Sequence, residues 1–101
     1  MSYHPVLLQR LDTETEEWLE VKRLHAVQVN RSAGTESFDS AAGQYHLRLG
    51  FRFAWSKVVE AIRFSPQHYR LIYNGQAFGV LDYDDYMESH LYVTITGGAY
   101  G

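Results

Sequence analysis

The chain contains no cysteine among its 101 residues. This absence excludes disulfides, thiolate catalysis and cysteine-based zinc or iron–sulfur sites, and it suits a protein that folds in a reducing cytoplasm. No apolar run approaches the roughly 20 residues that a membrane span needs, and no basic segment followed by an apolar one indicates a secretion signal. We therefore expect a soluble protein that carries no visible targeting signal.

Positive charge is also scarce. The formal net charge is -3 and the sequence pI is about 5.9, so the chain has no global basic field that would attract nucleic acid. What the chain does have is 46% hydrophobic and 15% aromatic residues, which is typical of a globular protein and favours β-structure. The length predicts a single domain covering residues 1–101.

Catalytic signatures are missing, since neither G-x-S-x-G nor a glycine-rich phosphate loop occurs. No spacing among the five histidines, at positions 4, 25, 46, 68 and 90, puts two ligands on one face. Carboxylates in a tight turn can hold a hard cation, but EF-hand spacing is absent. We interpret these acidic residues as a solvated hairpin turn: Asp82, Asp84, Asp85 and Glu88. The sequence thus predicts neither an enzyme nor a metal or cofactor site.

The segment Tyr69–Tyr86 contains the clearest hairpin. Asn74-Gly75 predicts a two-residue type I′ turn, because both central positions of that turn need positive φ. The side that this turn assigns to the core holds Tyr69, Leu71, Tyr73, Phe78 and Val80. The other side, which includes Arg70 and Ile72, is not fully polar, and we predict that these two residues contribute to a contact with another molecule.

Three further strands are predicted along the chain. Val6–Leu11 follows a proline, Gln44–Phe53 alternates apolar and polar side chains, and His90–Thr96 is the last strand. In that last strand we expect the inward side chains to be Leu91, Val93 and Ile95. Residues 97–101 are expected to be a flexible tail. Ser56 is a possible cap for a short helix, since apolar residues follow it at helical spacing.

Two interpretations of Trp18–Arg31 compete. Thr13 with Glu16 could form a capping box that opens a helix, whereas apolar residues on alternating positions indicate a strand with a bulge near His25-Ala26. We favour a long bent strand. The predicted fold is therefore all-β, a small antiparallel β-barrel or sandwich of five to six strands with at most one short helix and a long loop after the second strand.

That long loop, Ser32–Gly43, joins two predicted strands and consists mostly of small and polar residues. Loops of about 12 residues or more without their own structure are usually functional or disordered. The strand that follows presents a basic stripe of His46, Arg48 and Arg52, with its aromatic residues on the opposite side. We interpret this stripe as a polar outer face or a subunit contact.

Three segments, in this order, resemble one family: "EWLEVKRLHAVQVNRSAGTE", "LRLGFRFAW" and "YRLIYNGQAFGVLDYDD". The first has a Trp, a Val three residues later, and a small-residue segment with Gly34 and Glu36. The second is an alternating strand with an arginine near its end, and the third is a strand, an Asn-Gly turn and acidic residues. Together they resemble the head-tail joining proteins of tailed bacteriophages, the head-closure or stopper family, over roughly Val6 to Thr96.

The resemblance implies a structural virion protein, made in the bacterial host cytoplasm, that forms a homo-oligomeric ring of six or twelve copies at the neck of the virion. The implied partners are a portal or adaptor protein above, a tail terminator or tail-end protein below, and packaged DNA that faces the channel without sequence-specific binding; no membrane is implied. In this family the long loop points into the channel and closes it. On this sequence the gating residues are Ser32, Ala33, Gly34, Thr35, Glu36, Ser37, Phe38, Asp39, Ser40, Ala41, Ala42 and Gly43.

One alternative function stays open. A small β-barrel can bind single-stranded nucleic acid through a basic groove with aromatic side chains, and the arginines at positions 48 and 52 supply the charge. Salt-dependent binding that is lost when both become alanine would support this alternative.

Overall fold

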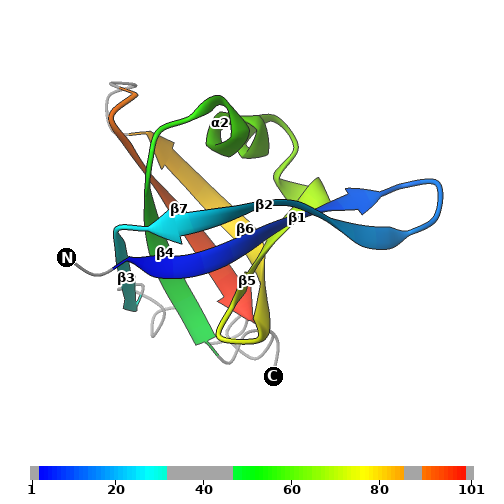
Figure 1. Ribbon diagram of the computed structural model, residues 1–101, viewed down its shortest axis with the longest axis horizontal. Helices are drawn as coiled ribbons and strands as arrows, with labels where there is room; N and C mark the ends of the chain where they lie inside the picture. The colour runs from blue at the N-terminus through cyan, green and yellow to red at the C-terminus, as the bar shows by residue number, and fades with distance from the viewer. Residues whose placement is uncertain (1–2, 32–46, 86–89, 100–101) are drawn as a thin grey trace.

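The computed structural model describes residues 3–31, 47–85 and 90–99. These residues form one antiparallel sheet in the order β2-β1-β5-β6-β7-β4-β3 (Figure 1). The strands are β1 His4–Asp12, β2 Glu17–Ala26, β3 Gln28–Arg31, β4 Leu47–Ala54, β5 Tyr69–Tyr73, β6 Gln76–Asp85 and β7 Tyr92–Ala99. The all-β prediction is confirmed, although the described residues hold seven strands where five to six were expected.

The sheet is rolled into a barrel-like shape without being a closed barrel. Its two edge strands, β2 and β3, follow one another in the chain with only Val27 between them. The Val27 N–H donates to the Arg52 carbonyl oxygen over 2.7 Å. At this point the chain stops pairing with β1 and begins pairing with β4, so one bent stretch of chain supplies both edges of the sheet.

The strand interpretation of Trp18–Arg31 is therefore confirmed, with its interruption at Val27 directly after the expected site at His25-Ala26. The capping box is wrong, because Thr13 and Glu16 lie in the turn between β1 and β2. In that turn Glu16 has φ 60°, a left-handed conformation that no helix start contains.

A single apolar core fills the rolled sheet. Its members, each at most 9% exposed, are Val6, Leu8, Leu24, Ala26, Phe51, Phe53, Val59, Ile62, Leu71, Phe78, Val93, Ile95 and Ala99. The Phe51 ring meets the Phe78 ring edge-on, with centroids 5.4 Å apart. The alternation predicted for β4 is confirmed over the described residues, since Phe51 and Phe53 are buried and Arg52 is exposed.

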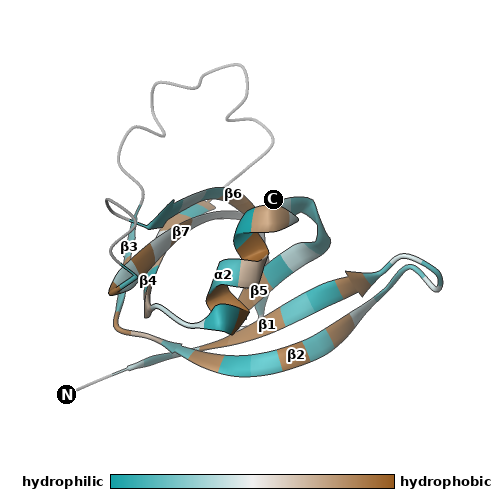
Figure 2. Cartoon of the chain, turned by 90° about the horizontal axis from the view of Figure 1, so that it is seen from above, coloured by the Kyte–Doolittle hydropathy of each residue, from teal (hydrophilic) through white to brown (hydrophobic). Residues whose placement is uncertain are grey.

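Helix α2, Lys57–Phe64, covers one end of the rolled sheet (Figures 1 and 2). The predicted cap is confirmed, because the Ser56 Oγ accepts a hydrogen bond from the Val59 N–H over 3.2 Å. The helix buries Val59 and Ile62 in the core. A short 3₁₀ helix, η2 Pro66–His68, then leads into β5.

The Asn74-Gly75 hairpin is confirmed in register and in turn type. Leu71 pairs with Phe78 across β5 and β6. The turn residues have φ 52° and 76°, the positive values that a type I′ turn requires. Both Leu71 and Phe78 are buried, as predicted for the core side.

Three expectations near the C-terminus are wrong. Asp82, Asp84 and Asp85 do not form a turn, because β6 continues through them and pairs with β7 as far as Asp85–Val93. Leu91 is 68% exposed rather than inward, because it precedes the first residue of β7.

Residues 97–99 are not a flexible tail. They complete β7 between β4 and β6, with Gly97 paired to both Leu49 and Val80. At Gly97 the lack of a side chain reflects crowding rather than flexibility, because a Cβ there would lie 2.9 Å from the Phe78 Cβ.

Candidate interaction surfaces

The predicted gating loop, Ser32–Gly43, and His46 lie outside the described residues. The strands on either side of the loop are described, and they are hydrogen-bonded neighbours: Arg31 of β3 pairs with Leu49 of β4. Leu47, at the start of β4, pairs with Ala99 at the end of β7. The chain therefore leaves and re-enters the sheet at the same end, close to the end of β7.

The basic stripe on β4 differs from the expectation in two respects: Arg48 is half-buried rather than exposed, and Arg52 has an aromatic ring beside it. Arg52 lies on the outer face, as predicted, and the aromatic residues of its own strand are buried. A tyrosine of the neighbouring strand nevertheless lies under it, since the Arg52 guanidinium sits 4.7 Å from the centroid of the Tyr92 ring. A cation held over an aromatic face is attracted by the ring quadrupole, so this arginine is oriented by Tyr92 on the surface of the molecule.

Arg70 contacts side chains on two neighbouring strands. Its Nε–H donates to the Gln9 Oε1 over 2.7 Å, and its guanidinium lies 4.5 Å from the centroid of the Trp18 ring. Burial lowers the pKa of Arg70 from its ordinary value, which leaves the group cationic at neutral pH. The residue thus ties together β1, β2 and β5, and Ile72 beside it is half-buried.

An open pocket of about 310 Å³ lies on the same outer side. Its lining residues are Trp18, Pro66, Gln67, Tyr69, Arg70, Ala77, Gly79, Val80 and Leu81. The pocket combines the second side of the Asn-Gly hairpin with the Trp18 side chain. The predicted second surface of the hairpin is therefore hollowed and partly apolar, and Ala77 within it is exposed.

The hairpin between β1 and β2 projects beyond the rest of the sheet (Figures 1 and 2). β1 pairs with β5 only from Leu7 to Arg10, and past that point its one strand partner among the described residues is β2. We call residues 10–21 the arm. The sequence did not predict this projection, because the length of β1 alone does not tell how much of it β5 covers.

A β-bulge at Val21 determines which side chains the arm presents on each face. Leu8 pairs with Lys22 and Gln9 with Glu20, which leaves Val21 as the extra residue. A bulge shifts the alternation of the strand by one position. Trp18 consequently shares the outer face with Arg70, while Leu19 comes to share the face of Arg10, its cross-strand partner.

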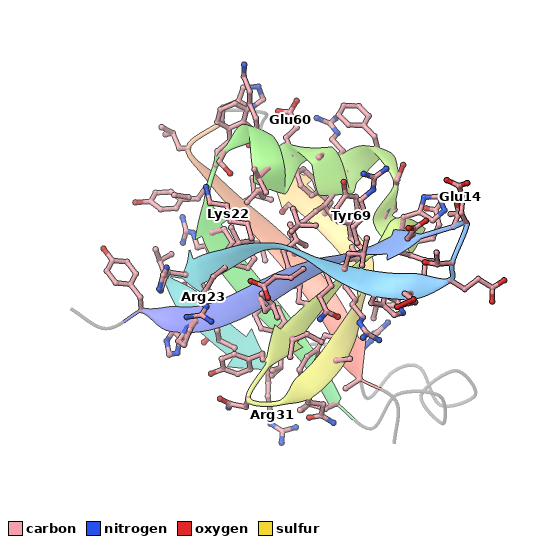
Figure 3. The ribbon with its side chains drawn as sticks, turned by 45° about the vertical axis from the view of Figure 1, so that its right-hand side comes forward. Glu14, Lys22, Arg23, Arg31, Glu60 and Tyr69 are labelled. Carbon is pink, nitrogen blue, oxygen red and sulfur yellow. The ribbon has the colours of Figure 1, made fainter. Side chains whose placement is uncertain are left out.

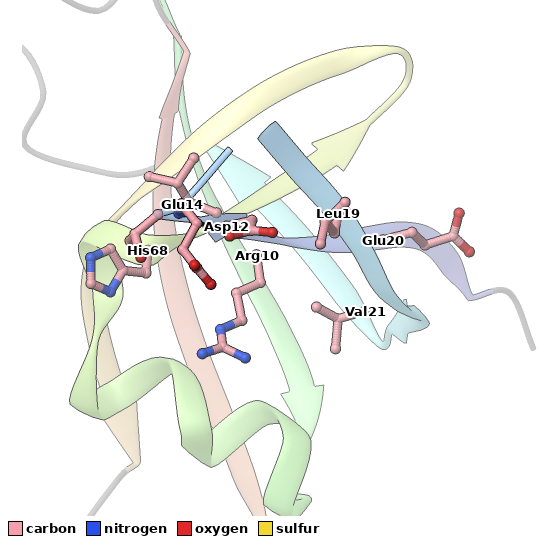
Figure 4. Close-up of a pocket in the computed structure, with 9 residues that line it drawn as sticks. Arg10, Asp12, Glu14, Leu19, Glu20, Val21 and His68 are labelled. Carbon is pink, nitrogen blue, oxygen red and sulfur yellow. Dashed lines mark hydrogen bonds between the residues drawn. The ribbon is translucent and has the colours of Figure 1, made fainter. Parts of the chain in front are cut away.

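On this second face the arm forms an open pocket of about 560 Å³ with η2 (Figure 4). The side chains of Arg10 and Val21 point from the arm into the space above helix α2, and His68 closes one side. The exposed fractions of Leu19 and Val21 are 51% and 44%. Apolar side chains are thus exposed here between charged ones.

A polar cluster joins helix α2 to the start of β7. The Asp85 side chain is 2% exposed, and its Oδ2 lies 2.6 Å from the His90 Nδ1 while its Oδ1 accepts the His90 N–H over 3.1 Å. The His90 ring stacks on Trp55 with centroids 4.8 Å apart, and the Trp55 indole N–H donates to the Glu60 Oε1 over 2.8 Å. We assign this cluster a structural role, because its groups satisfy one another.

Beside this cluster, the Tyr83 hydroxyl is buried and has no hydrogen-bond partner among the described residues. Burial, followed by the negative charges of Asp85 and Glu60, raises the pKa of the Tyr83 phenol above its usual value, and Arg63 opposes this shift. The phenol therefore stays protonated at neutral pH.

The acidic residues considered for a cation do not gather into one site. Asp82 and Asp84 are exposed on β6, Asp85 is buried beside His90, and Glu88 is outside the described residues. In the part of the chain that the structure describes, no three His, Asp or Glu side chains converge to hold a metal ion. Within the same part, no helix is long and apolar enough to cross a membrane.

A family model described as "Phage head completion protein" matches residues 8–98 of the chain. This match spans all of β2 to β6 and most of β1 and β7. A search of curated proteins finds no match for the chain.

Proposed function

Because the chain belongs to the phage head completion protein family, and is thus a structural protein of the phage head-tail region, we propose that it is the head-closure subunit. Copies of the chain form a ring below the portal and adaptor proteins, retain the packaged DNA, and offer a docking surface to the tail end. The family match over residues 8–98 carries the proposal. It confirms the family suggested by the three sequence segments.

The topology of the sheet supports a loop that acts in the channel. Residues 32–46 connect β3 and β4, which are antiparallel partners at one edge of the rolled sheet. A segment inserted between paired strands can change position without breaking the core, because its ends are held by the sheet. We assign the gate to Ser32–Gly43, with Phe38 as its one large apolar residue.

The surfaces of the folded part support a role in assembly rather than in catalysis. Two open pockets flank the arm, and both bring apolar and charged side chains together. Six large hydrophobic side chains are exposed among the described residues, and two of them, Leu19 and Val21, line the same pocket on the arm. Contacts with neighbouring copies and with the adaptor and tail-end proteins would cover them.

Electron microscopy of lysates tests the role directly. The parent phage should carry a nonsense mutation in this reading frame, and the control is the same lysate complemented with the intact chain. We expect emptied heads beside complete but unattached tails, and normal virions on complementation. Normal virions without complementation would refute the head-closure role.

Deleting Ser32–Gly43 tests the gate separately. The matched control replaces the same residues with an equally long glycine-serine segment, which keeps the length and removes Phe38. We expect both variants to fold with an unchanged far-ultraviolet circular dichroism spectrum, because the core that the described residues form does not draw on this segment. Heads carrying the deletion should lose DNA to added nuclease, whereas intact DNA retention by the deletion would exclude the gate.

A further inference from the structure

The arm is an unpartnered part of the sheet. Its strand β2 lies at the edge of the seven-strand order, so one row of its backbone groups has no strand partner among residues 3–31, 47–85 and 90–99. Leu19 and Val21 are exposed on the face that lines the pocket. An exposed edge with apolar side chains invites pairing with another chain.

The arm is also strongly acidic. The arm contains five acidic residues and one basic residue, Arg10, so the remaining residues together carry a small net positive charge. Its acidic side chains from Glu14 onward are exposed. Such a surface repels phosphate groups and attracts a basic protein surface.

A basic surface with exposed aromatic rings lies on the opposite side of the same molecule. Figure 3 shows Glu14 at one extreme and Lys22 and Arg23 on the other side of the body. Both basic residues are exposed on β2, beyond the bulge. We call the basic side the exposed residues Tyr3, Lys22, Arg23, Arg52 and Tyr92.

The chain segments that carry the basic side contact one another. Tyr3 meets the ring of His25 edge-on, with centroids 6.4 Å apart. Two residues later Val27 bonds to the backbone of Arg52, whose guanidinium covers Tyr92. Tyr3 and Tyr92 are 51% and 44% exposed, so the basic side offers apolar ring surface to a partner, as the arm offers Leu19 and Val21.

We propose that the arm of one copy docks on the basic side of the next copy, so that the ring is closed by a heterologous contact between these two surfaces. The inference rests on the proposed ring function and specifies its subunit interface. Charge complementarity selects a second copy as the occupant, since acidic and basic surfaces stand on opposite sides of one chain. A head-to-tail contact of this kind generates a ring when its rotation closes.

Cysteine crosslinking in assembled particles tests the contact, because the chain has no cysteine of its own. The nonsense-mutant phage is complemented with Glu17→Cys/Arg23→Cys, and purified particles are treated with a short bismaleimide. Within one chain the two positions are roughly 20 Å apart at about 3.3 Å per strand residue, too far for such a reagent. We expect a ladder of multimers from the double variant and monomer from each single variant.

The matched control is Asp82→Cys/Arg23→Cys, which keeps one reactive position and moves the other to an exposed residue of β6. This control should give no ladder. Particles that contain the chain but yield no ladder from the double variant would overturn the arm contact and leave the head-closure role standing. Particles that lack the chain would instead overturn the proposed function, so the two failures are distinguishable.

Charge reversal gives a second, independent measurement in case a cysteine variant fails to fold. Lys22→Glu/Arg23→Glu should lower plaque yield about tenfold or more, because like charges then face each other across the contact. Adding Glu14→Lys/Glu17→Lys in the same chain should restore the yield. Lack of restoration by a folded chain would overturn the pairing of these two surfaces.

Discussion

The end of β7 and the arm use side-chain size in opposite ways. Gly97, Gly98 and Ala99 are small and buried, whereas Leu19 and Val21 are large, apolar and about half exposed. β7 lies in the middle of the sheet with β4 and β6 on its two sides, while β2 lies at an edge. The position of a strand in the sheet therefore determines how far its side chains are buried. The central strand β7 leaves room only for small residues at its end, whereas the edge strand β2 can carry large ones.

The two regions differ in the free space around their side chains. At Gly97 the space for a side chain is already occupied by Phe78 and Phe51. The core therefore packs closely only because this residue has no side chain. On the arm, Leu19 and Val21 are left about half exposed by the residues that the structure describes. We expect substitutions near β7 to change stability and substitutions on the arm to change assembly.

The largest effect is expected from Gly97→Ala. The added Cβ would lie 2.9 Å from the Phe78 Cβ and 3.3 Å from the Phe51 Cε1. Because the first of these atoms is fixed to the backbone, strands β6 and β7 have to move apart. We expect the free energy of unfolding to fall by about 2–3 kcal/mol, measured by urea denaturation.

Gly50→Ala is the matched control for that variant. A Cβ at Gly50 would have its nearest atoms at 3.8 Å, an ordinary contact distance. This variant should leave stability unchanged or raise it by at most about 1 kcal/mol, because alanine reduces the entropy of the unfolded chain. Equal losses in both variants would show that crowding at Gly97 is not what keeps β7 free of side chains there.

A smaller loss is expected from Asp85→Ala. Its carboxylate contacts both the backbone N–H and the ring of His90, which lies just before β7. Removing the carboxylate leaves both His90 groups without this acceptor. We expect a loss of about 1–3 kcal/mol in urea denaturation. Asp84→Ala, one residue away and exposed, is the control and should change stability by at most about 0.5 kcal/mol.

Local signals in the sequence predicted local structure correctly. Asn74-Gly75 set both the turn type and the register of β5 against β6, and Ser56 capped helix α2, because each depends on only a few neighbouring residues. The alternation around Phe51 and Phe53 likewise predicted a buried face. The same approach was wrong for Gly97, since glycine is common both in flexible tails and at close contacts between strands.

Contacts between residues that are far apart in the chain could not be predicted from the sequence. The contact of Arg70 with Trp18 joins β5 to β2, and the position of Tyr92 under Arg52 joins β7 to β4. Neither pair has a spacing that a pattern could detect, because the sheet order brings the partners together. For the candidate site, the sequence named the loop Ser32–Gly43, which stays a prediction, and it missed the arm as a contact surface.

Tyr83→Phe tests how far the body of the protein tolerates an unsatisfied group. The buried hydroxyl has no partner among the described residues, so its removal ends a desolvation cost without breaking a bond. We expect thermal denaturation to show a stability equal to the parent or higher by about 1 kcal/mol at neutral pH. A loss comparable to that of Asp85→Ala would mean that the hydroxyl is bonded in solution.

For the same variant we expect the pH dependence of stability to change at alkaline pH. The pKa of Tyr83 is raised in the folded state, chiefly by burial, so the folded chain holds this proton more tightly than the unfolded chain does. Stability from this group is fully present below the unfolded pKa, about 10, and is lost as pH rises through the folded value. Denaturation midpoints between neutral and alkaline pH should fall less steeply for Tyr83→Phe than for the parent.

The smallest effect on stability is expected on the arm. Leu19→Ser/Val21→Ser replaces two side chains that are already about half exposed, so the free energy of unfolding should change by at most about 0.5 kcal/mol. Particle assembly should nevertheless be impaired, because the apolar part of the proposed contact is lost while the charges stay.

The control is Phe64→Ser, which removes a side chain that is 73% exposed at the end of helix α2 and outside the arm. Chain copies per purified particle, counted by quantitative mass spectrometry, should fall for the arm variant and stay at the parent value for the control. If instead the arm variant unfolds at lower denaturant and assembles normally, the arm is part of the core, and the contrast with β7 fails.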